Sequence, residues 1–259
     1  MTSAQQFDSG IEYWHWISQQ PWNRLRYTLV QVNLRRQLGP APLRILDVGG
    51  GSGEDAITLA QQGHTVTLVD FSGEMLDDAR RKIDSVGLGG QITLQQVDLL
   101  KLPDLFPEPL FDCVLFHNVL QYVEDPRKAI QAISVPIKPG GLLSLVSVNR
   151  YSDAMTAALL HLDLEGAAQA IEARSSQHPG FGTMTQRYAA QDVIEMLQAA
   201  GYDLCGHYGI RCVSDYIYDN EKKADPEFYA RLERLEIELS DKYPYYLLAR
   251  FFHLFARKK

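Results

Sequence analysis

The sequence predicts an α/β fold with a seven-stranded, mostly parallel sheet and helical insertions. Short apolar and β-branched runs alternate along the chain with segments whose apolar residues recur at helical spacing. Such alternation is typical of crossovers from strand to helix to strand, which produce parallel sheets. A glycine-rich turn, "DVGGGSG" from Asp47 to Gly53, follows the first apolar run and suits the step from a first strand into a first helix.

The same patterns place the individual elements. Strands are expected at Arg44–Val48, Thr65–Val69, Gln91–Val97, Phe111–Phe116, Leu142–Val148, Tyr202–Tyr208 and Leu247–Ala256. Helices are expected at Trp22–Leu38, Glu54–Gln62, Gly73–Val86, Pro126–Ile137, Ala189–Ala200 and Pro226–Ser240. Gly63 and Gly201 are typical stop signals for the helices that precede them, and "KPGG" is a turn signal after Ile137.

Three segments do not belong to the alternation. They are residues 1–38, residues 149–188 after the fifth strand, and residues 213–246 between the last two strands. Ligands bind at the carboxyl edge of a parallel sheet, where such insertions begin. We interpret the three segments as a helical lid on one domain that spans residues 1–259. The alternative is that they only enlarge the core.

Composition limits the classes of protein that fit. The chain has 259 residues, of which 46% are hydrophobic, and these are ordinary values for a globular protein. Its net charge of −7 argues against broad capture of nucleic acid. No apolar run is long enough to span a membrane, and no secretory signal is visible. Cys113, Cys205 and Cys212 form no CxxC pair, so we expect buried thiols, a cytoplasmic location and no metal site.

The glycine turn indicates a ligand that approaches the backbone closely. Glycine permits positive φ and removes the Cβ that would block a ligand, and a helix N-terminus offers free N–H groups. The stretch Gly51–Ala56 also fits a dinucleotide pattern, which alone is weak. A pyrophosphate there would meet the carboxylates of Asp47, Glu54 and Asp55, whereas a ligand with an ammonium group would be attracted by them.

Two further acids fit the same ligand. Asp70 ends the second strand, where a carboxylate can accept both ribose hydroxyls, and Asp98 ends the third, where it can meet an adenine amino group. Phe71 and Met75 can pack on the ribose and adenine faces. Taken singly, Asp70 could be a helix cap and Asp98 a turn residue. Together with Asp47 they predict S-adenosylmethionine as the cofactor.

Longer motifs resemble a known family. "ILDVGGGSG", "LVDFS" and "FDCVLFHNVLQYVEDP" resemble class I methyltransferases, which have a seven-stranded Rossmann-like sheet, over about residues 24–150. "LVSVNR", "GYDLCGHYGIRCVSDYI" and "YPYYLLARFFHLFARKK" are similar to bacterial tRNA 5-carboxymethoxyuridine methyltransferases. This resemblance implies a tRNA partner and esterification of the carboxylate of a modified wobble uridine by S-adenosylmethionine.

The resemblance also implies roles for several residues. Arg26 would hold the carboxylate of the cofactor, and Gly49 with Gly50 would approach its amino-acid arm. Leu99 would join Asp98 at the adenine. The complete set of expected cofactor-binding residues is Arg26, Asp47, Gly49, Gly50, Gly51, Gly53, Asp70, Phe71, Met75, Asp98, Leu99 and His117.

A carboxylate acceptor needs no general base, because it is already ionised at pH 7. We therefore name no catalytic base. His117 is the candidate base for an acceptor that starts protonated, and its alternative role is a strand-end histidine bonded to backbone. Arg211 is the candidate that grips the acceptor carboxylate in a bidentate fork. The alternative for Arg211 is a salt bridge to Asp215.

Other residues are candidates for contacts with the substrate. Tyr151, Tyr188 and Tyr216 could stack on a base, although packing within the lid is an alternative for each. A phosphate-facing patch, or else a solvated surface, is expected from Arg150, Arg174, Arg187, Arg250, Arg257, Lys258 and Lys259. Two other functions fit the sequence: a methyltransferase for a small-molecule carboxylate or phenol, and a regulator that binds the cofactor without catalysis.

Overall fold

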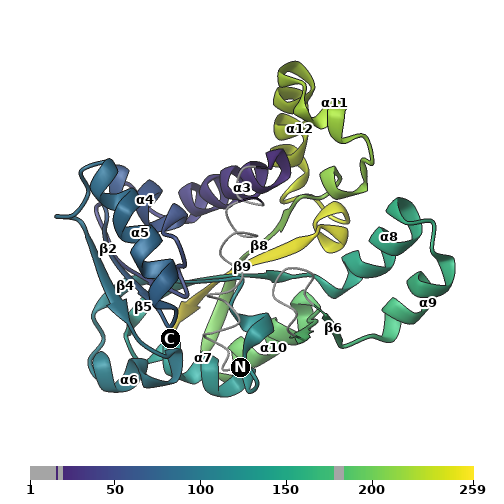
Figure 1. Cartoon of the computed structure of the whole chain (residues 1–259). Helices are drawn as coiled ribbons and strands as arrows, with labels where there is room; N and C mark the ends of the chain where they lie inside the picture. Colours follow the sequence, from purple (N-terminus) through teal and green to yellow (C-terminus); the bar gives the residue numbers. More distant parts are fainter. Residues whose placement is uncertain (1–15, 17–19, 178–183) are drawn as a thin grey trace.

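The computed structural model of the chain describes residue 16 and residues 20–177 and 184–259 (Figure 1). Parts of the expected lid, residues 1–15, 17–19 and 178–183, lie outside the described residues.

The centre of the structure is a seven-stranded sheet in the order β3-β2-β1-β4-β5-β9-β8. Its strands are β1 (Arg44–Val48), β2 (Thr65–Asp70), β3 (Ile92–Gln96), β4 (Phe111–His117), β5 (Ile137–Val148), β8 (Tyr202–Ile210) and β9 (Phe251–Lys258). The strands from β3 to β5 pair in parallel, whereas β9 runs antiparallel to both β5 and β8. The predicted fold class, a mostly parallel Rossmann-like sheet, is confirmed.

Helices cover both faces of the sheet (Figure 1). One face packs on α3 (Pro21–Gln37), α4 (Glu54–Gln61), α5 (Gly73–Ser85) and α12 (Pro226–Leu239). The other face packs on α6 (Leu102–Leu105), α7 (Pro126–Ser134) and α10 (Ala190–Ala199). Successive strand residues such as Ile45 and Leu46 enter opposite cores, because side chains alternate along a strand. Burial on both faces explains why the strands read as continuous apolar runs.

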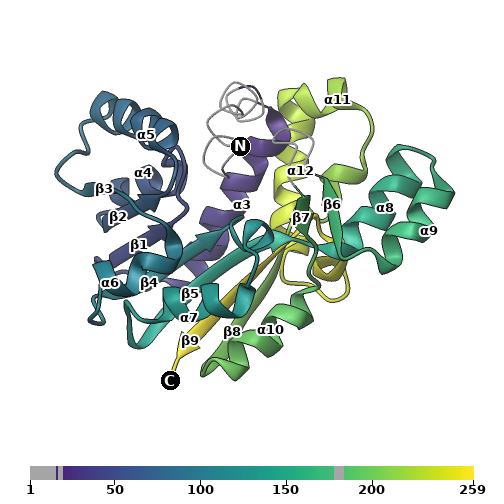
Figure 2. The ribbon, with the colours of Figure 1, turned by 60° about the horizontal axis from the view of Figure 1, so that its bottom comes forward.

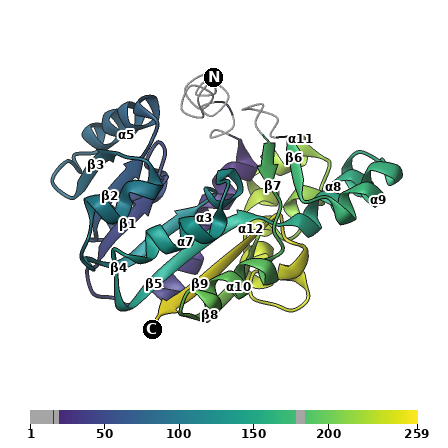
Figure 3. The same cartoon turned by 90° about the horizontal axis from the view of Figure 1, so that it is seen from below.

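The inserted segments leave the sheet at the carboxyl end of β5 and after β8. The first contains α8 (Arg150–Leu160), α9 (Leu164–Glu172) and the antiparallel pair β6 (Ser175–Gln177) and β7 (Met184–Gln186). The second contains η3 (Ser214–Tyr216), α11 (Asn220–Ala224), α12 and η4 (Tyr245–Leu248). Figures 2 and 3 show α8 and α9 projecting beyond the sheet, away from α5.

Two predicted boundaries were wrong for identifiable reasons. "KPGG" lies inside β5 instead of before it, as an irregularity in which the register shifts between Phe111 and Cys113. A Cβ on Gly141 would come within 2.7 Å of Ile137 Cγ2, so this bend requires glycine. The last strand begins later than expected because Asn149 Nδ2 donates to the carbonyls of Leu247 and Ala249, at 2.8 and 2.9 Å.

The cysteine prediction was right for two of three residues. Cys113 and Cys212 are buried, but Cys205 is exposed because β8 is an edge strand. None of the helices in the described part of the chain is long and apolar enough to cross a membrane.

Candidate active site

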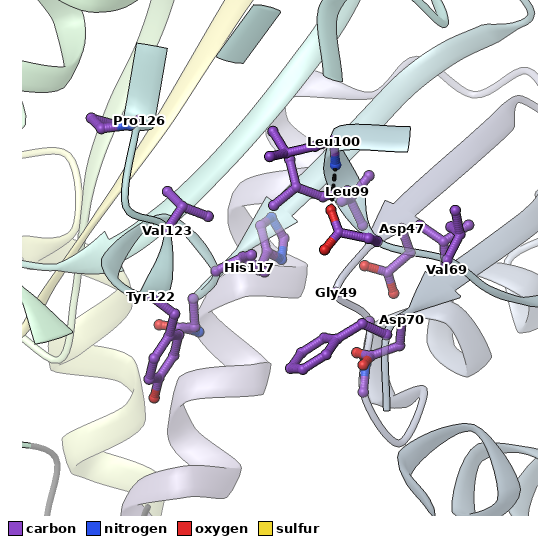
Figure 4. A pocket seen from close by; sticks show the side chains of 18 of the residues that line it. Asp47, Gly49, Val69, Asp70, Leu99, Leu100, His117, Tyr122, Val123 and Pro126 are labelled. Carbon is purple, nitrogen blue, oxygen red and sulfur yellow. Dashed lines mark hydrogen bonds between the residues drawn. The ribbon is translucent and has the colours of Figure 1, made fainter. Parts of the chain in front are cut away.

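A pocket of about 1370 Å³ opens at the carboxyl edge of β1, β2 and β4 (Figure 4). All but one of the expected cofactor-binding residues line it, namely Arg26, Asp47, Gly49, Gly50, Gly51, Asp70, Phe71, Met75, Asp98, Leu99 and His117. The sheet topology brings them together, because parallel strands end at one edge.

The glycine turn has the conformation that its composition predicts. Gly49, Gly51 and Gly53 have φ of 68°, 54° and 84°, which lie in the left-handed region that favours glycine. Gly50 needs glycine for space, because its Cβ would lie 2.6 Å from Asp47 Oδ2.

Gly53 is the exception among the expected cofactor-binding residues, since it does not line the pocket. It is the N-cap of α4, and a Cβ there would lie 3.4 Å from the Cβ of Ala79 on α5. Its geometry supports close packing of the two helices.

Four carboxylates surround the turn, and three of them are held by neighbouring groups. Glu54 pairs with Lys82, at 2.6 Å between Nζ and Oε1, and also accepts from the Ser52 hydroxyl. Asp70 accepts the backbone N–H groups of Gly51 and Ser72, each at 2.9 Å. Asp70 thus fixes the end of β2 against the turn, and Ser72 rather than Asp70 caps α5.

Asp55 is held from two sides. Gln31 Nε2 donates to Oδ1 and His117 Nδ1 contacts Oδ2, both at 2.9 Å. Burial works to raise the pKa of Asp55, but the hydrogen bond and charge of His117, with Arg26 and Gln31, lower it below its ordinary value. Asp55 is therefore an ionised carboxylate inside the pocket.

Asp47 differs from the other three acids. Its Oδ2 is buried and has no hydrogen-bond partner among the described residues. Burial, followed by the charges of Asp55, Asp70 and Glu54, raises its pKa well above the ordinary value. A cation beside Asp47 would relieve both effects, so this part of the pocket suits an ammonium group.

His117 lies at the end of β4 with both ring nitrogens engaged. Nδ1 meets Asp55, and Nε2 lies 2.8 Å from Ser144 Oγ. These partners are side chains rather than the backbone groups of the sequence-based alternative. His117 lines the pocket, yet neither nitrogen is available to take a proton from an acceptor.

The remaining expected cofactor residues surround the same space. The Arg26 guanidinium lies 4.3 Å from the centre of the Tyr27 ring. Asp98 caps η1 (Leu99–Lys101) by accepting the Leu100 N–H at 2.8 Å, so its role as a turn residue coexists with a place in the pocket. In Figure 4, Asp47, Asp70 and His117 lie around one open space.

None of the expected substrate-binding residues lines this pocket. Arg211 is 8% exposed, and its guanidinium forms a bidentate ion pair with Asp215, with Nε to Oδ1 at 2.7 Å and Nη2 to Oδ2. The geometry therefore favours the salt-bridge alternative for Arg211. Tyr216 is bonded as well, because its hydroxyl donates to the Leu248 carbonyl at 2.5 Å.

Arg150 stands in a different environment. It begins α8 directly after β5, and Nε and Nη1 are buried without a hydrogen-bond partner among the described residues. Its guanidinium lies 5.3 Å from the ring centre of Tyr151, which is 45% exposed. The backbone N–H of Arg150 donates to the carbonyl of half-buried Tyr188. Two buried guanidinium nitrogens without a partner among the described residues suit an anion.

The structure divides the expected basic patch. Arg187 and Arg250 bind the two carboxylate oxygens of Asp153, at 2.6 and 2.7 Å. Because β9 is antiparallel to β5, Arg257 pairs with Leu142 at the opposite end of the strand from the pocket. The prediction of one shared patch was wrong, since Lys258 and Lys259 follow Arg257 to that far edge.

Sequence reasoning missed the second wall of the pocket. It is formed by residues after β4, on α7, and from β7 and α10: Asn118, Val119, Tyr122, Val123, Arg127, Lys128, Met184 and Met196. The position of "NVLQYV" directly after a strand end could have identified the first four. Nothing local marks Met184, which only tertiary packing brings to the pocket.

Comparisons with known proteins agree with this geometry. Residues 46–145 match a family described as a methyltransferase domain. The tRNA 5-carboxymethoxyuridine methyltransferase of Escherichia coli (strain K12) is 31% identical over 245 residues, covering 91% of this chain and 88% of that protein. The ubiquinone/menaquinone biosynthesis C-methyltransferase UbiE of Pectobacterium carotovorum subsp. carotovorum (strain PC1) is 25% identical over 194 residues, 71% of this chain and 74% of that protein.

Solved structures share the fold. An S-adenosylmethionine-dependent methyltransferase from Mesorhizobium loti has a TM-score of 0.58 at 20% identity and covers 89% of this chain and 98% of its own. One from Aquifex aeolicus has a TM-score of 0.54 at 16% identity, with 88% of each chain covered.

The sheet order and the acidic pocket define a class of enzyme, and the chain belongs to the class I S-adenosylmethionine-dependent methyltransferases. Its cofactor is S-adenosylmethionine. The pocket fits this cofactor, because the buried Asp47 Oδ2 has no hydrogen-bond partner in the part of the chain that the structure describes, and Gly49, Gly50 and Gly51 line the pocket beside it. Within the class, the chain is similar to the tRNA 5-carboxymethoxyuridine methyltransferase of E. coli over nearly its whole length.

Proposed function

We propose that this enzyme esterifies the carboxylate of 5-carboxymethoxyuridine at the wobble position of a tRNA. The observation that carries the proposal is the similarity to the E. coli enzyme of that activity, which extends over 91% of the chain and so includes the inserted segments. A similarity limited to the cofactor-binding half of the chain would support only the class of reaction. The proposed setting is the cytoplasm, where tRNA is found.

Different residues of the pocket bind different parts of the cofactor. Asp47 and Asp55 hold its ammonium group, Arg26 its carboxylate, and Asp70 its ribose, while Asp98 and Leu99 meet the adenine. The bound cofactor supplies a methyl group on a sulfonium, already activated for displacement. The chain has only to align the acceptor and exclude water, which contributes several kcal/mol.

The acceptor side of the proposal rests on Arg150. A carboxylate acceptor is ionised at pH 7 and needs no base, which suits a pocket where both nitrogens of His117 are engaged. It does need a cation to hold it. Arg150, whose buried Nε and Nη1 have no partner among the described residues, fits that role better than Arg211, whose fork holds Asp215.

A direct assay tests the function. Purified enzyme with isotopically labelled S-adenosylmethionine is incubated with tRNA that carries the unmethylated carboxyl group, and digested nucleosides are examined by mass spectrometry. We expect label in a methyl ester of a wobble uridine that mild alkali removes. The Asp47→Asn variant, assayed at a cofactor concentration that only the wild type binds, is the control with weakened cofactor binding. Absence of label in tRNA, with wild-type cofactor affinity, would reject the proposed substrate.

A second candidate is a methyltransferase for a small-molecule carboxylate or phenol. The net charge of −7 favours it, because tRNA is a polyanion. A panel of small carboxylic acids and phenols in the same assay separates the two. Label in a small acid and none in tRNA supports this second candidate.

A further inference from the structure

A continuous chain of side-chain contacts runs from the pocket through the sheet to α3. His117 Nε2 lies 2.8 Å from Ser144 Oγ, which lies 2.7 Å from His253 Nε2. His253 Nδ1 lies 3.5 Å from Asn33 Nδ2. These groups come from β4, β5, β9 and α3, and Ser144, His253 and Asn33 are each fully buried.

Both ends of this chain are charged, and they fix the direction of the bonds beside them. At the far end, Arg36 Nη1 donates to Asn33 Oδ1 at 3.1 Å. A guanidinium can only donate, so the amide oxygen of Asn33 faces Arg36 and the amide nitrogen faces His253. At the pocket end, the ionised Asp55 can only accept from His117 Nδ1.

The positions of the ring protons then follow. Asn33 donates to His253 Nδ1, so the proton of that ring is on Nε2 and is donated to Ser144 Oγ. Ser144 Oγ accepts this proton, and it can either donate its own hydrogen to an unprotonated His117 Nε2 or accept from a protonated one, because a hydroxyl oxygen has two acceptor lone pairs. In both cases His117 carries a proton on Nδ1, which it donates to Asp55. Burial, with the charges of His117 and His207, also lowers the pKa of His253 well below its ordinary value, which agrees with a neutral ring.

We propose that Asn33, His253 and Ser144 are positioning residues that orient the His117 ring with a proton on Nδ1, and thereby hold Asp55 toward the cofactor. Reversal of these hydrogen-bond directions would place the Asn33 amide hydrogens against Arg36. A His117 ring protonated on Nε2 alone would leave Asp55 without this donor. The proposal concerns the cofactor side of the pocket and does not depend on which acceptor is methylated.

The first test is the state of the histidines in the whole protein. In enzyme with 15N-labelled histidine at pH 7, the ring nitrogen shifts report the position of each proton, and spectra of His117→Gln and His253→Gln assign the signals. We expect a proton on Nδ1 of His117 and the Nε2–H tautomer for His253. An unprotonated Nδ1 at His117, or an Nδ1–H tautomer at His253, would overturn the proposal, whatever the activity.

The second test removes one link. In Ser144→Ala we expect His117 to lose its fixed proton on Nδ1 and the affinity for S-adenosylmethionine, measured by calorimetry, to fall about five- to thirtyfold. Ser144→Thr keeps the hydroxyl and should retain both properties. Ser147→Ala is the matched control, because Ser147 is also buried on β5 but donates to Gln121, at 3.0 Å.

An unchanged proton position at His117 and an unchanged affinity in Ser144→Ala would contradict the proposal, and so would equal losses in Ser144→Ala and Ser147→Ala. If Ser144→Ala does not fold, the wild-type proton positions and the Ser144→Thr variant still decide.

Discussion

At the scale of single residues, the site is defined by which charges have partners. Glu54, Asp55 and Asp70 are each bonded to groups of the chain, whereas Asp47 Oδ2 is buried without a partner among the described residues. The unpartnered carboxylate is thus the one that a cationic ligand would stabilise most. A buried charge of this kind costs stability in the free protein.

This cost gives a prediction for Asp47→Asn. The raised pKa of Asp47 means that the folded protein binds its proton more tightly than the unfolded chain does. The free energy of unfolding therefore falls as pH rises from about 3.9 through the folded-state value. Asparagine has no such proton, so without cofactor the variant should be more stable than wild type at pH 8. At pH 5 this difference in stability should be smaller. Its affinity for S-adenosylmethionine should fall about ten- to a hundredfold.

Thermal unfolding at the two pH values and calorimetry check the prediction. Asp70→Asn is the matched control: its amide would place a donor against the N–H of Gly51 or Ser72, so that variant should lose stability. A less stable Asp47→Asn at pH 8, or one with undiminished affinity, would contradict the role given to Asp47.

Arg150 and Arg211 make a second pair of opposite predictions. Arg150→Lys keeps the charge and loses the planar fork, so kcat/KM for the carboxylate acceptor should fall about ten- to a hundredfold while Tm and cofactor affinity stay near wild type. Arg211→Lys should do the reverse: its bidentate pair with Asp215 is lost, so Tm falls and the kinetics of the folded enzyme change little. Steady-state kinetics and thermal unfolding of both variants decide between the two arginines.

Residue types alone could not have made that distinction. Arg211 and Arg150 both follow a strand, and each has an aspartate three or four residues later, Asp215 and Asp153. What separates them is the position of Asp215, which the turn after β8 folds back onto Arg211. The glycine turn was predictable because positive φ leaves a local signature, whereas an ion pair depends on how the chain returns.

At the scale of elements, one buried side chain holds the second insertion to the sheet. Glu236 on α12 is fully buried and accepts the backbone N–H groups of Cys212, Val213 and Ser214, at 2.5, 3.0 and 2.7 Å. These N–H groups follow the end of β8 and have no strand to pair with. Glu236 therefore joins α12 to the turn that carries Arg211.

We expect Glu236→Gln to weaken this junction. An amide has one acceptor oxygen, and its NH₂ would face one of the three N–H groups, so at least one buried donor loses its partner. The loss should be about 1–3 kcal/mol, or about 2–4 °C in Tm for each kcal/mol. Cofactor affinity should not change, because Glu236 lies outside the pocket. Leu239→Ala, on the same helix, is the control, because this variant keeps the capping carboxylate of Glu236. Unchanged stability in Glu236→Gln would show that the cap contributes little.

The same scale shows how far the elements themselves were predictable. Strands and helices with buried faces were found in the right order, because their apolar periodicity is imposed by packing on two cores. The segment that holds α8 and α9 was expected to belong to a helical lid, but the bounds of the two helices were not predicted. Neither helix has more than one buried residue, so little apolar periodicity marks them.

At the scale of the whole molecule, charge decides how a tRNA could bind. The chain carries a net charge of −7, and the antiparallel direction of β9 takes Arg257 away from the pocket edge. Near that edge, Arg187 and Arg250 share the single carboxylate of Asp153. On the pocket wall and on the insertion after β5, four further described cations have no ion pair with another described residue or only a long one, namely Arg127, Lys128, Arg150 and Arg174.

The salt dependence of tRNA binding should reflect this small number of available cations. With about four phosphate or carboxylate contacts, log Kd should rise with log salt concentration with a slope no steeper than about 4. Arg127→Ala should lower the slope by about 1, because Arg127 lines the pocket. Arg257→Ala, at the opposite edge, should leave it unchanged. Titrations of tRNA between 50 and 200 mM salt measure these slopes. A slope above about 6, or an equal effect of both substitutions, would mean that tRNA covers the far edge as well, and that the pocket edge alone does not explain its recognition.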